Sequence, residues 1–458
     1  MLCKKGYVIK KKNIDESTLL RIKHDLIVQP YVNPEYSEIP KPFKIYTENS
    51  KKIYMPRCYG ITKFGKPKKY KNMNGFPIDI EFDGKLRDYQ TIAVDKCLDE
   101  LKNKSGCGIL ALDAGLGKTS CSLFIACKLK RKTLVIVHKE FLMNQWKDRI
   151  TQFIPSALIG IIQQKKIDIN GKDIVIAMLQ SISMIDYKMD IFNQFGTVII
   201  DECHLIPCRV FSKALRKINS TYMLGLSATP KRKDGMDIVL YKYIGEIIYQ
   251  KMRELDYKVE VKRLIYNCDD QEYCKELYTY KRINMVGMIT QIVEYKPRND
   301  IILNTAIELY NDNRKILILS DRRNHLNIIY NELKDKINNN IGYYVGGMKK
   351  DQLKDSETKQ IILGTYSMAS TGLDIPELDT LIFASPKSDI HQSAGRIMRK
   401  KGIHHKLIID IVDMFSVFIG QSYKRLKFYK KNKYDITDEQ LGKNEDIYVD
   451  TDILNLIL

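Results

Sequence analysis

Apolar residues along the chain gather in short continuous runs rich in Val, Ile and Leu, and amphipathic stretches such as 139–153 and 323–337 lie between the runs. Continuous apolar strands that alternate with helices are typical of parallel sheets covered on both faces. The expected strands are 133–138, 173–178, 197–201, 221–229, 315–320, 360–366, 380–386 and 406–412. The pattern therefore predicts an α/β fold with two parallel-sheet domains, at about residues 85–250 and 300–425.

The segments outside these two domains differ in composition. Residues 1–80 are expected to form a separate basic accessory module, and the polar, Tyr-rich segment 251–299 to link domains that span 81–250 and 300–430. Residues 431–458 are expected to be a tail or a small docking helix. The sequence contains no run of about 18 apolar residues, so we expect no membrane span. The ten scattered cysteines and the absence of a signal-peptide pattern favour an intracellular protein with reduced thiols.

The charge of the chain points to a polyanion. The net charge is +20, and residues 1–80 hold 17 Lys and Arg against 7 Asp and Glu, half of that total. Residues 63–71 mix basic and aromatic side chains, which suits phosphates and stacked bases. Nucleic acid is the simplest partner. The alternative is a solvated Lys-rich surface that reflects coding biased toward Lys, Ile and Asn.

A turn between a strand and a helix resembles a phosphate cradle. An apolar strand over 107–112 leads to Gly115 and Gly117, and a helix begins after them. Lys118 is placed to reach the β- and γ-phosphates of a nucleotide, and the Thr119 hydroxyl to hold Mg²⁺. The first glycine of the usual pattern is replaced by Leu112. The alternative is a glycine turn before an ordinary helix.

Two carboxylates end the strand at 198–201. Asp201 suits a Mg²⁺ bound to phosphate, and Glu202 could position or deprotonate an attacking water. His204 could couple the nucleotide to a neighbouring domain, although a lone histidine is more often structural. Farther on, the hydroxyls of Ser227 and Thr229 stand at another strand end, where they could relay between the sites.

The second domain offers polar residues of the same kind. Thr365, Ser367 and Thr371 precede a turn at Gly372–Asp374. Arg396 and Arg399 are expected at i and i+3 on one helical face, where they could stabilise charge on a γ-phosphate. The alternative is a basic helix face on the surface.

These segments occur in one order and at domain-sized spacings, and in that order the chain resembles a superfamily 2 DExH helicase over about residues 80–430. The resemblance implies two tandem RecA-like domains of the P-loop NTPase class. It is closest to the XPB-like branch and to helicases of large DNA viruses, including the poxvirus transcript-release helicase. The matching segments are KLRDYQ (85–90), DAGLGKT (113–119), VIVHKEFLMNQW (135–146), AMLQSI (177–182), DECH (201–204), SAT (227–229), TYSMASTGLDIP (365–376) and QSAGRIMR (392–399).

The resemblance implies a role for each matching residue. Asp201, Glu202, Lys118, Arg396 and Arg399 would form the catalytic set, with Mg²⁺ held by Thr119 and Asp201. The ATP-binding set would be Arg87, Gln90, Ala114, Gly115, Leu116, Gly117, Lys118, Thr119, Ser120, Gly372 and Asp374. Coupling would fall to His204, Ser227, Thr229 and Gln392, and nucleic-acid contacts to His138, Thr365 and Ser367.

The sequence thus predicts an ATP- and Mg²⁺-dependent DNA helicase or translocase, with a role in viral transcription termination or elongation. An RNA helicase, a translocase serving a partner nuclease, and a nucleic-acid-binding scaffold with weak ATPase are the alternatives. The expected partners are DNA or RNA and the transcription machinery, with no membrane. A viral protein of this kind would reside in the host cytoplasm, a viral factory or the virion.

Overall fold

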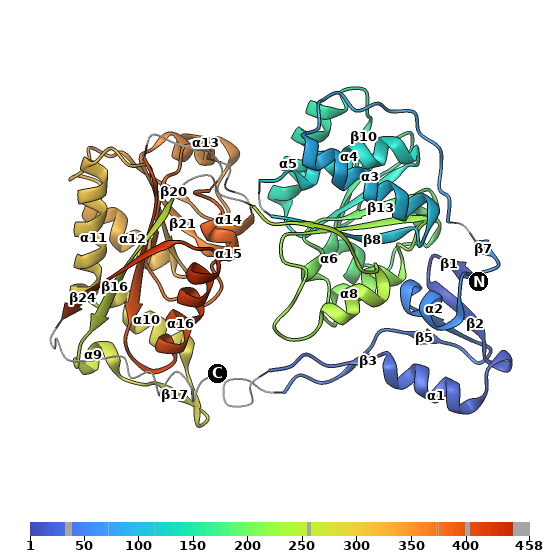
Figure 1. Cartoon of the computed structure of the whole chain (residues 1–458), viewed down its shortest axis with the longest axis horizontal. Coiled ribbons are helices and arrows are strands. Elements are labelled where there is room, and N and C mark those ends of the chain that lie inside the picture. The colour runs from blue at the N-terminus through green and yellow to red at the C-terminus, as the bar shows by residue number, and fades with distance from the viewer. Residues whose placement is uncertain are drawn as a thin grey trace. The chain divides into compact units, whose positions relative to one another are not determined.

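The computed structural model describes residues 1–32, 39–71, 73–113, 115–253, 258–371, 373, 375–398 and 404–442. The chain divides into two compact units, Met1–Arg253 and Glu254–Leu458, and each is built around one large sheet (Figure 1). No helix among the described residues is long and apolar enough to cross a membrane.

The first unit contains an eight-stranded sheet in the order β11-β10-β12-β9-β13-β14-β8-β15. Every neighbouring pair is parallel except the edge pair of β10 and β11. The strands are β8 (Cys107–Leu112), β9 (Thr133–Val137), β10 (Ile159–Gln163), β11 (Lys166–Asp168), β12 (Ile174–Met178), β13 (Thr197–Ile200), β14 (Tyr222–Ser227) and β15 (Ile247–Lys251). The continuous apolar runs of the sequence are thus the buried strands of a parallel sheet.

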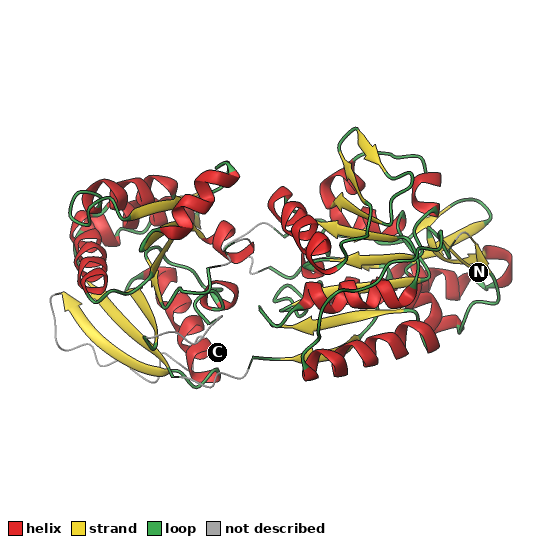
Figure 2. Ribbon diagram, turned by 90° about the horizontal axis from the view of Figure 1, so that it is seen from above, coloured by secondary structure: helices red, strands yellow, loops and turns green. Residues whose placement is uncertain are grey.

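Helices cover both faces of this sheet (Figure 2). One apolar cluster packs against α3 (Asp88–Asn103), α4 (Lys118–Leu129) and α5 (Glu140–Phe153). The opposite cluster involves α6 (Leu179–Met184), α7 (Asp190–Asn193) and α8 (Asp237–Tyr243). Strands buried on both sides need apolar side chains at every position, which explains the unbroken runs.

The N-terminal residues form a five-stranded sheet of their own, in the order β5-β6-β2-β1-β7. Its strands are β1 (Leu2–Cys3), β2 (Gly6–Lys10), β5 (Thr47–Glu48), β6 (Lys52–Met55) and β7 (Tyr70–Lys71). The helices α1 (Glu16–Asp25) and α2 (Arg57–Phe64) and the two-stranded pair β3 (Ile27–Val28) and β4 (Phe43–Lys44) complete this segment. We call residues 1–80 the N-terminal module.

The N-terminal module is less separate than the sequence suggests. Its buried residues and the α6–α8 face of the large sheet form one apolar cluster. Polar contacts join them as well: Lys4 Nζ donates to Phe195 O (2.7 Å) and Ser220 Oγ (2.8 Å), and Arg57 Nη1 donates to Ser220 O (2.6 Å). Tyr243 Oη donates to Ile45 O at 2.6 Å. The module therefore folds onto the first unit rather than standing apart from it.

The second unit contains a seven-stranded sheet in the order β20-β21-β19-β22-β23-β16-β24, and all of its pairs are parallel. The strands are β16 (Val259–Asn267), β19 (Ile316–Ser320), β20 (Ile341–Tyr344), β21 (Ile361–Thr365), β22 (Thr380–Phe383), β23 (Lys406–Asp413) and β24 (Asp435–Gly442). The helices are α9 (Gln271–Cys274), α10 (Met285–Glu294), α11 (Lys296–Asn311), α12 (Arg323–Leu333), α13 (Lys350–Thr358), α14 (Tyr366–Thr371), α15 (His391–Ala394) and α16 (Ser416–Lys431).

Two predicted segments differ from the structure. The expected linker 251–299 includes β16, which lies inside the second sheet between β23 and β24, so most of this segment belongs to the second unit. The expected tail 431–458 contains β24, which pairs with β16 over eight residues. The polar strand β24 has no apolar run, and the ion pairs Lys262–Glu439 and Arg263–Asp438 fix it to its neighbour. An edge strand held by backbone and surface charges gives little hydrophobic signal.

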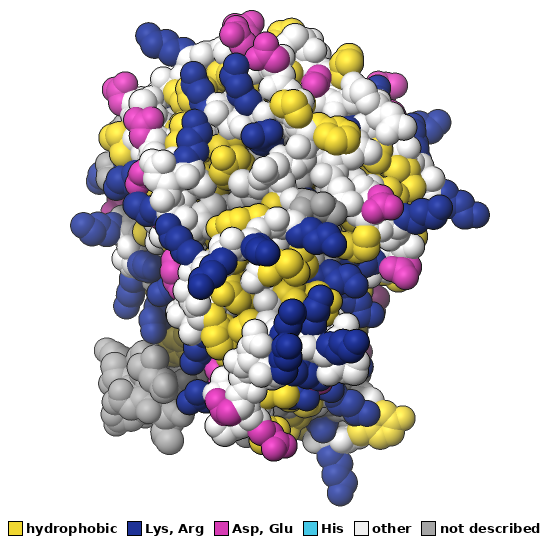
Figure 3. Space-filling model, turned by 90° about the vertical axis from the view of Figure 1, so that its right-hand side faces the viewer, with side chains coloured by type: hydrophobic (Ala, Val, Ile, Leu, Met, Phe, Trp, Pro, Cys, Tyr) yellow, Lys and Arg dark blue, Asp and Glu magenta, His cyan; other side chains and the backbone are white. Residues whose placement is uncertain are grey.

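Basic side chains are abundant on one side of the first unit (Figure 3). The exposed lysines of the N-terminal module include Lys66, Lys68, Lys69 and Lys71, which stand beside the exposed Tyr70. All ten cysteines are free thiols, and five of them are buried: Cys97, Cys107, Cys121, Cys127 and Cys203.

Candidate nucleotide and nucleic-acid sites

The turn between β8 and α4 has the backbone that a phosphate cradle requires. Gly115 and Gly117 adopt φ of +80° and +84°, a region that side chains other than glycine rarely occupy. A Cβ at Gly117 would lie 2.2 Å from Gln90 Nε2, so a side chain there would also collide with its neighbour. Tyr89 Oη and Gln90 Nε2 both donate to the carbonyl of Leu116, at 3.2 and 3.0 Å, and fix the loop from the outside.

Lys118 is the first residue of α4, and its Nζ donates to the carbonyl of Leu112 at 3.1 Å. Thr119 and Ser120 follow in the first turn, where backbone N–H groups of a helix have no partner within the helix. Leu112 is the last residue of β8 and its side chain is buried in the core. The position of the missing glycine is thus a strand residue outside the turn, which explains why an apolar side chain fits there.

Gln90 holds the loop rather than facing open solvent. Its Oε1 accepts from the backbone N–H of Arg87 at 2.9 Å while its Nε2 donates to Leu116, and the residue is only 5% exposed. Arg87 is exposed at the N-cap of α3. The predicted adenine contacts of Arg87 and Gln90 stay predictions; what the structure adds is that Gln90 ties α3 to the phosphate loop.

The carboxylates after β13 lie close to one another and to Lys118. Asp201 is partly buried, and desolvation raises its pKa to about 6, with the nearby charge of Glu202 adding to the rise. The Trp146 indole Nε1 donates to Asp201 Oδ2 at 2.9 Å, and the Lys118 charge also favours the ionised carboxylate. Glu202 stands next in the chain with a left-handed backbone at φ 47°. The charge of Glu202 repels that of Asp201, and a bound cation would relieve this repulsion.

His204, Ser227 and Glu202 form a short polar chain beside these carboxylates. His204 Nδ1 lies 3.0 Å from Ser227 Oγ and 3.4 Å from Glu202 Oε2. Ser227 Oγ also accepts from the backbone N–H of Thr229 at 3.1 Å. Arg232 Nη1 donates to the carbonyl of His204 at 2.6 Å. The structure therefore joins three of the four residues expected to couple the site.

His138 lies at the end of β9, on the edge of the sheet that also carries Asp201. Burial lowers its pKa to about 4, with smaller contributions from the charges of Lys139 and His204. Its carbonyl accepts from Gln180 Nε2 at 2.6 Å. A neutral, partly buried imidazole contributes little charge to a phosphate, so His138 would act through its polar ring nitrogens.

In the second unit the expected polar residues occupy two neighbouring segments. Thr365 Oγ1 and Ser367 Oγ lie 3.4 Å apart where β21 meets α14. Gln392 is in α15, and Arg396 Nη1 donates to the carbonyl of Leu373 at 2.9 Å. This bond joins the two segments that the sequence matches to different motifs.

The expected helical face of Arg396 and Arg399 is wrong for Arg396. The helix α15 ends at Ala394, and Gly395 follows it as the C-cap residue, in keeping with the low helix propensity of glycine. Arg396 is only 8% exposed, so its side chain does not belong to a basic surface face. Four expected site residues, Ala114, Gly372, Asp374 and Arg399, lie outside the described residues.

A nucleotide with Mg²⁺ fits the residues of the first unit. The two left-handed glycines, the start of α4 and the Lys118 amine suit phosphate oxygens. Asp201, with a raised pKa, and the hydroxyl of Thr119 supply hard oxygen ligands of the kind that Mg²⁺ prefers. Parallel strands bring these groups together, because the loops after β8, β13 and β14 all leave from the same edge of the sheet.

One residue of this site was not singled out from the sequence. Trp146, the only tryptophan of the chain, lies on α5 and is 1% exposed. A buried indole N–H needs an acceptor, and a carboxylate at the neighbouring strand end supplies it. The need of a buried indole N–H for an acceptor is the signal that could have identified Trp146 from the sequence.

Comparison with protein families places two models on the chain. The family described as "Type III restriction enzyme, res subunit" matches residues 83–232, and "Helicase conserved C-terminal domain" matches residues 299–401. The first range contains the phosphate cradle and the carboxylates, and the second contains Thr365, Ser367 and Arg396.

Individual proteins resemble the chain over much of its length. A protein of Acanthamoeba polyphaga mimivirus named as an ATP-dependent RNA helicase is 38% identical over 99% of this chain and 90% of its own length. A helicase of Invertebrate iridescent virus 6 is 30% identical over 78% of this chain and 84% of its own. A protein of African swine fever virus, also named as an ATP-dependent RNA helicase, is 27% identical over 78% and 75%.

Solved structures share the fold. A fragment of an HsdR subunit of a type I restriction enzyme from Vibrio vulnificus matches with a TM-score of 0.56 and 18% identity, over 79% of this chain and 69% of that one. At this identity the likeness speaks for the architecture alone.

Proposed function

The chain belongs to the superfamily 2 helicases, and on this premise we propose that it is a DNA helicase or translocase that couples ATP hydrolysis to movement along a strand. Its two RecA-like domains with parallel sheets are the predicted fold class. Helicases of this family in general use ATP and bind nucleic acid. The choice of DNA, the strand movement and the residue roles are the proposal.

The observation that supports the proposal most directly is the Lys118–Asp201–Glu202 cluster in the first unit. Lys118 and Thr119 would hold the phosphates and Mg²⁺, Asp201 would bind the metal, and Glu202 would accept a proton from the attacking water. His204 and Ser227 would transmit the state of this cluster to the segment after β14. The hydrogen bonds of this polar network join residues of the first unit.

The proposal assigns Arg396 and Arg399 the stabilisation of charge on the nucleotide. It assigns Thr365, Ser367 and His138 to the nucleic-acid backbone, whose contacts would be insensitive to sequence and sensitive to salt. These roles rest on the order of the motifs along the chain.

DNA is the proposed track because the motif pattern resembles the XPB-like branch, and because the first unit matches a restriction-enzyme family. An RNA helicase is the second candidate, since two of the viral relatives are named as RNA helicases. A role in viral transcription, inside the infected cell, extends the proposal through the resemblance to the poxvirus transcript-release helicase.

The test is steady-state ATPase of the whole chain, without nucleic acid and with single-stranded DNA, duplex DNA or RNA, at two salt concentrations. Lys118→Ala is the matched control, and we expect its turnover to fall by at least about a hundredfold because the phosphate contact is lost. Its nucleic-acid binding, followed by fluorescence anisotropy of a labelled oligonucleotide, should change little.

The outcomes separate the candidates. Stimulation by DNA and not by RNA supports the DNA motor, whereas stimulation by RNA alone moves the assignment to the second candidate. Binding of nucleic acid without turnover in the wild-type chain would leave a scaffold with a weak ATPase. Undiminished turnover of Lys118→Ala would remove the phosphate cradle from the mechanism.

A further inference from the structure

A small β-hairpin projects from the second unit between α9 and α10. It pairs β17 (Tyr278–Thr279) with β18 (Arg282–Ile283), and its two-residue turn is Tyr280 and Lys281. Tyr280 is 96% exposed, and no other exposed large apolar side chain among the described residues reaches that fraction. A tyrosine ring almost wholly in water contributes nothing to the packing of its own fold.

The ring stands among cations and further apolar side chains. Lys281 and Arg282 follow it directly, and both are exposed. Met285 and Val286, at the start of α10, are 43% and 66% exposed. An aromatic ring beside two cations suits a nucleobase stacked on the ring and phosphates held by the charges.

The turn is built from residues that do not favour it. Tyr280 and Lys281 have φ of 52° and 62°, and two-residue hairpins of this kind favour Asn, Asp and Gly at both positions. A bulky side chain in the left-handed region is uncommon and strains the backbone. The strained backbone of the turn therefore places the Tyr280 ring and the Lys281 amine at the tip of the hairpin.

The base of the hairpin is firmly held. Asn284 N donates to Leu277 O at 2.7 Å across the base, and Asn284 Oδ1 accepts from Gly287 N at 2.9 Å and caps α10. Arg322, in the loop after β19, donates to Val286 O at 3.0 Å. The hairpin is thus attached to the carboxyl-end edge of the second sheet.

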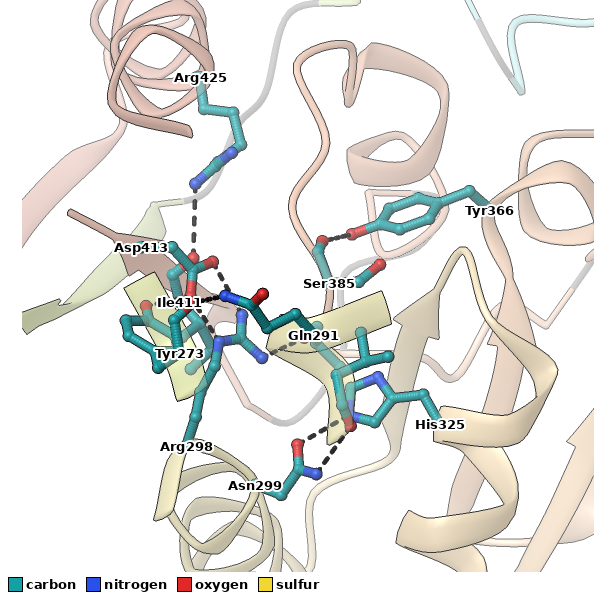
Figure 4. A network of polar contacts seen from close by, with 12 residues as sticks. Tyr273, Gln291, Arg298, Asn299, His325, Tyr366, Ser385, Ile411, Asp413 and Arg425 are labelled. Atoms are coloured by element: carbon teal, nitrogen blue, oxygen red, sulfur yellow. Dashed lines mark hydrogen bonds and ion pairs between the residues drawn. The ribbon is translucent and has the colours of Figure 1, made fainter. Parts of the chain in front are cut away.

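A buried polar network anchors the segments on both sides of it (Figure 4). Gln291 Nε2 donates to Tyr273 O at 2.6 Å and to Lys275 O at 3.2 Å, which joins α10 to the chain entering the hairpin. Tyr273 Oη donates to Asp413 Oδ1 at 2.7 Å. Arg298 donates to both oxygens of Asp413, at 2.5 and 3.0 Å, and neither side chain is more than 1% exposed. Hydrogen bonds thus hold the segments at the base of the hairpin, whereas Tyr280 at its tip is exposed.

We propose that Tyr280 stacks on a base of an unpaired nucleic-acid strand, with Lys281 and Arg282 on the adjoining phosphates. The inference rests on the proposed function, since it supplies a nucleic-acid contact outside the residues assigned above. Such a contact needs no particular sequence, because every base has a face on which a ring can stack.

The test compares Tyr280→Asn with Tyr280→Phe and with Tyr31→Asn. Asparagine tolerates the left-handed turn, so it removes the ring without straining the hairpin. Phenylalanine keeps the ring, and Tyr31 is a tyrosine of the first unit, 73% exposed, that controls for loss of a surface aromatic. The probe is a single-stranded oligonucleotide carrying 2-aminopurine, whose fluorescence falls when the base stacks.

Tyr280→Asn should bind the oligonucleotide about tenfold more weakly and lose most of the fluorescence quenching, because a base stacked on an aromatic ring contributes that much. Tyr280→Phe and Tyr31→Asn should behave as the wild type.

Affinity and quenching of Tyr280→Asn equal to those of the wild type would overturn the proposal and leave the tip to a protein partner. An equal loss of affinity in Tyr31→Asn would overturn it too, because the effect would not be specific to the hairpin. Failure of the proposed function would be seen in a different measurement: the ATPase turnover of the wild-type chain would be the same with and without nucleic acid.

Discussion

At the scale of single residues, the proposed ATP site contains a hydrogen-bond donor, Trp146, to which the proposal gives no ligand of its own. Trp146 donates one hydrogen bond of 2.9 Å to Asp201, which lies beside the like charge of Glu202 and the opposite charge of Lys118. Partners that orient a metal ligand commonly matter almost as much as the ligand.

Trp146→Phe keeps the apolar packing of α5 and removes this donor. We expect the half-saturating Mg²⁺ concentration for ATP hydrolysis to rise about 10- to 100-fold, since Asp201 loses both its orientation and a group that favours its charged form. The measurement is a Mg²⁺ titration of turnover. Met143→Leu, at another buried position of the same helix, is the control and should leave the titration unchanged. A Mg²⁺ requirement that stays the same in Trp146→Phe would show that Asp201 needs no such support.

Lys4 gives a second prediction at this scale, on stability against pH. Burial lowers its pKa from 10.5 to about 7. Below pH 7 it is protonated in the folded and the unfolded chain alike, and between 7 and 10.5 the unfolded chain holds the extra proton. The free energy of unfolding should therefore gain a contribution that rises with pH across this window.

Lys4→Met removes that contribution, although it also removes one donor to Phe195 O and the Lys4 donor to Ser220 Oγ. Urea unfolding at pH 7 and pH 9.5 is the measurement, and the wild type should gain stability relative to the variant as pH rises. Parallel stability curves for the two proteins would show that the buried amine keeps an ordinary pKa.

At the scale of elements, apolar runs predicted the central strands and failed at the edges. The strands β9, β12, β13 and β19 are buried on both faces, so their sequences are apolar throughout and can be recognised one by one. The edge strand β24 is mostly exposed and polar, and its place depends on pairing with β16, which a local pattern cannot show.

The residues of the candidate site divide in the same way, into those marked by a local sequence pattern and those placed by contacts with distant segments. Lys118, Asp201 and His204 stand directly at strand or helix ends, where a short motif marks them. The sequence marked Arg396 as a site residue but could not predict its surroundings. Its hydrogen bond to Leu373 O joins segments more than twenty residues apart. Trp146 and Gln90 owe their roles to partners on other elements, and only the folded chain shows those partners.

At the scale of the whole molecule, the basic N-terminal module cannot be tested by removing it. Its side chains share an apolar cluster with the first sheet, so a chain beginning at residue 81 would expose residues such as Phe195, Ile218 and Tyr243. A loss of binding in that chain would not be separable from a loss of folding.

Point changes of charge avoid this difficulty. Replacing the exposed Lys66, Lys68 and Lys69 together by Ala should flatten the dependence of log Kd on log salt concentration by roughly two to three units, if each lysine meets a phosphate. Anisotropy titrations from low to moderate salt measure that slope. The charge-matched control replaces the exposed lysines Lys102, Lys165 and Lys166 of the same unit. Equal slopes in both triple variants would mean that the module faces another partner.

The apolar cluster shared by the N-terminal module and the first sheet also affects how the chain folds during its synthesis. Tyr243 donates to the carbonyl of Ile45, and these two residues leave the ribosome almost two hundred positions apart. At about 5–20 residues per second, the module waits roughly 10–40 s for the last part of the surface that buries it. Until then its apolar face lacks part of its native cover, and apolar surface that stays exposed during synthesis is prone to aggregation.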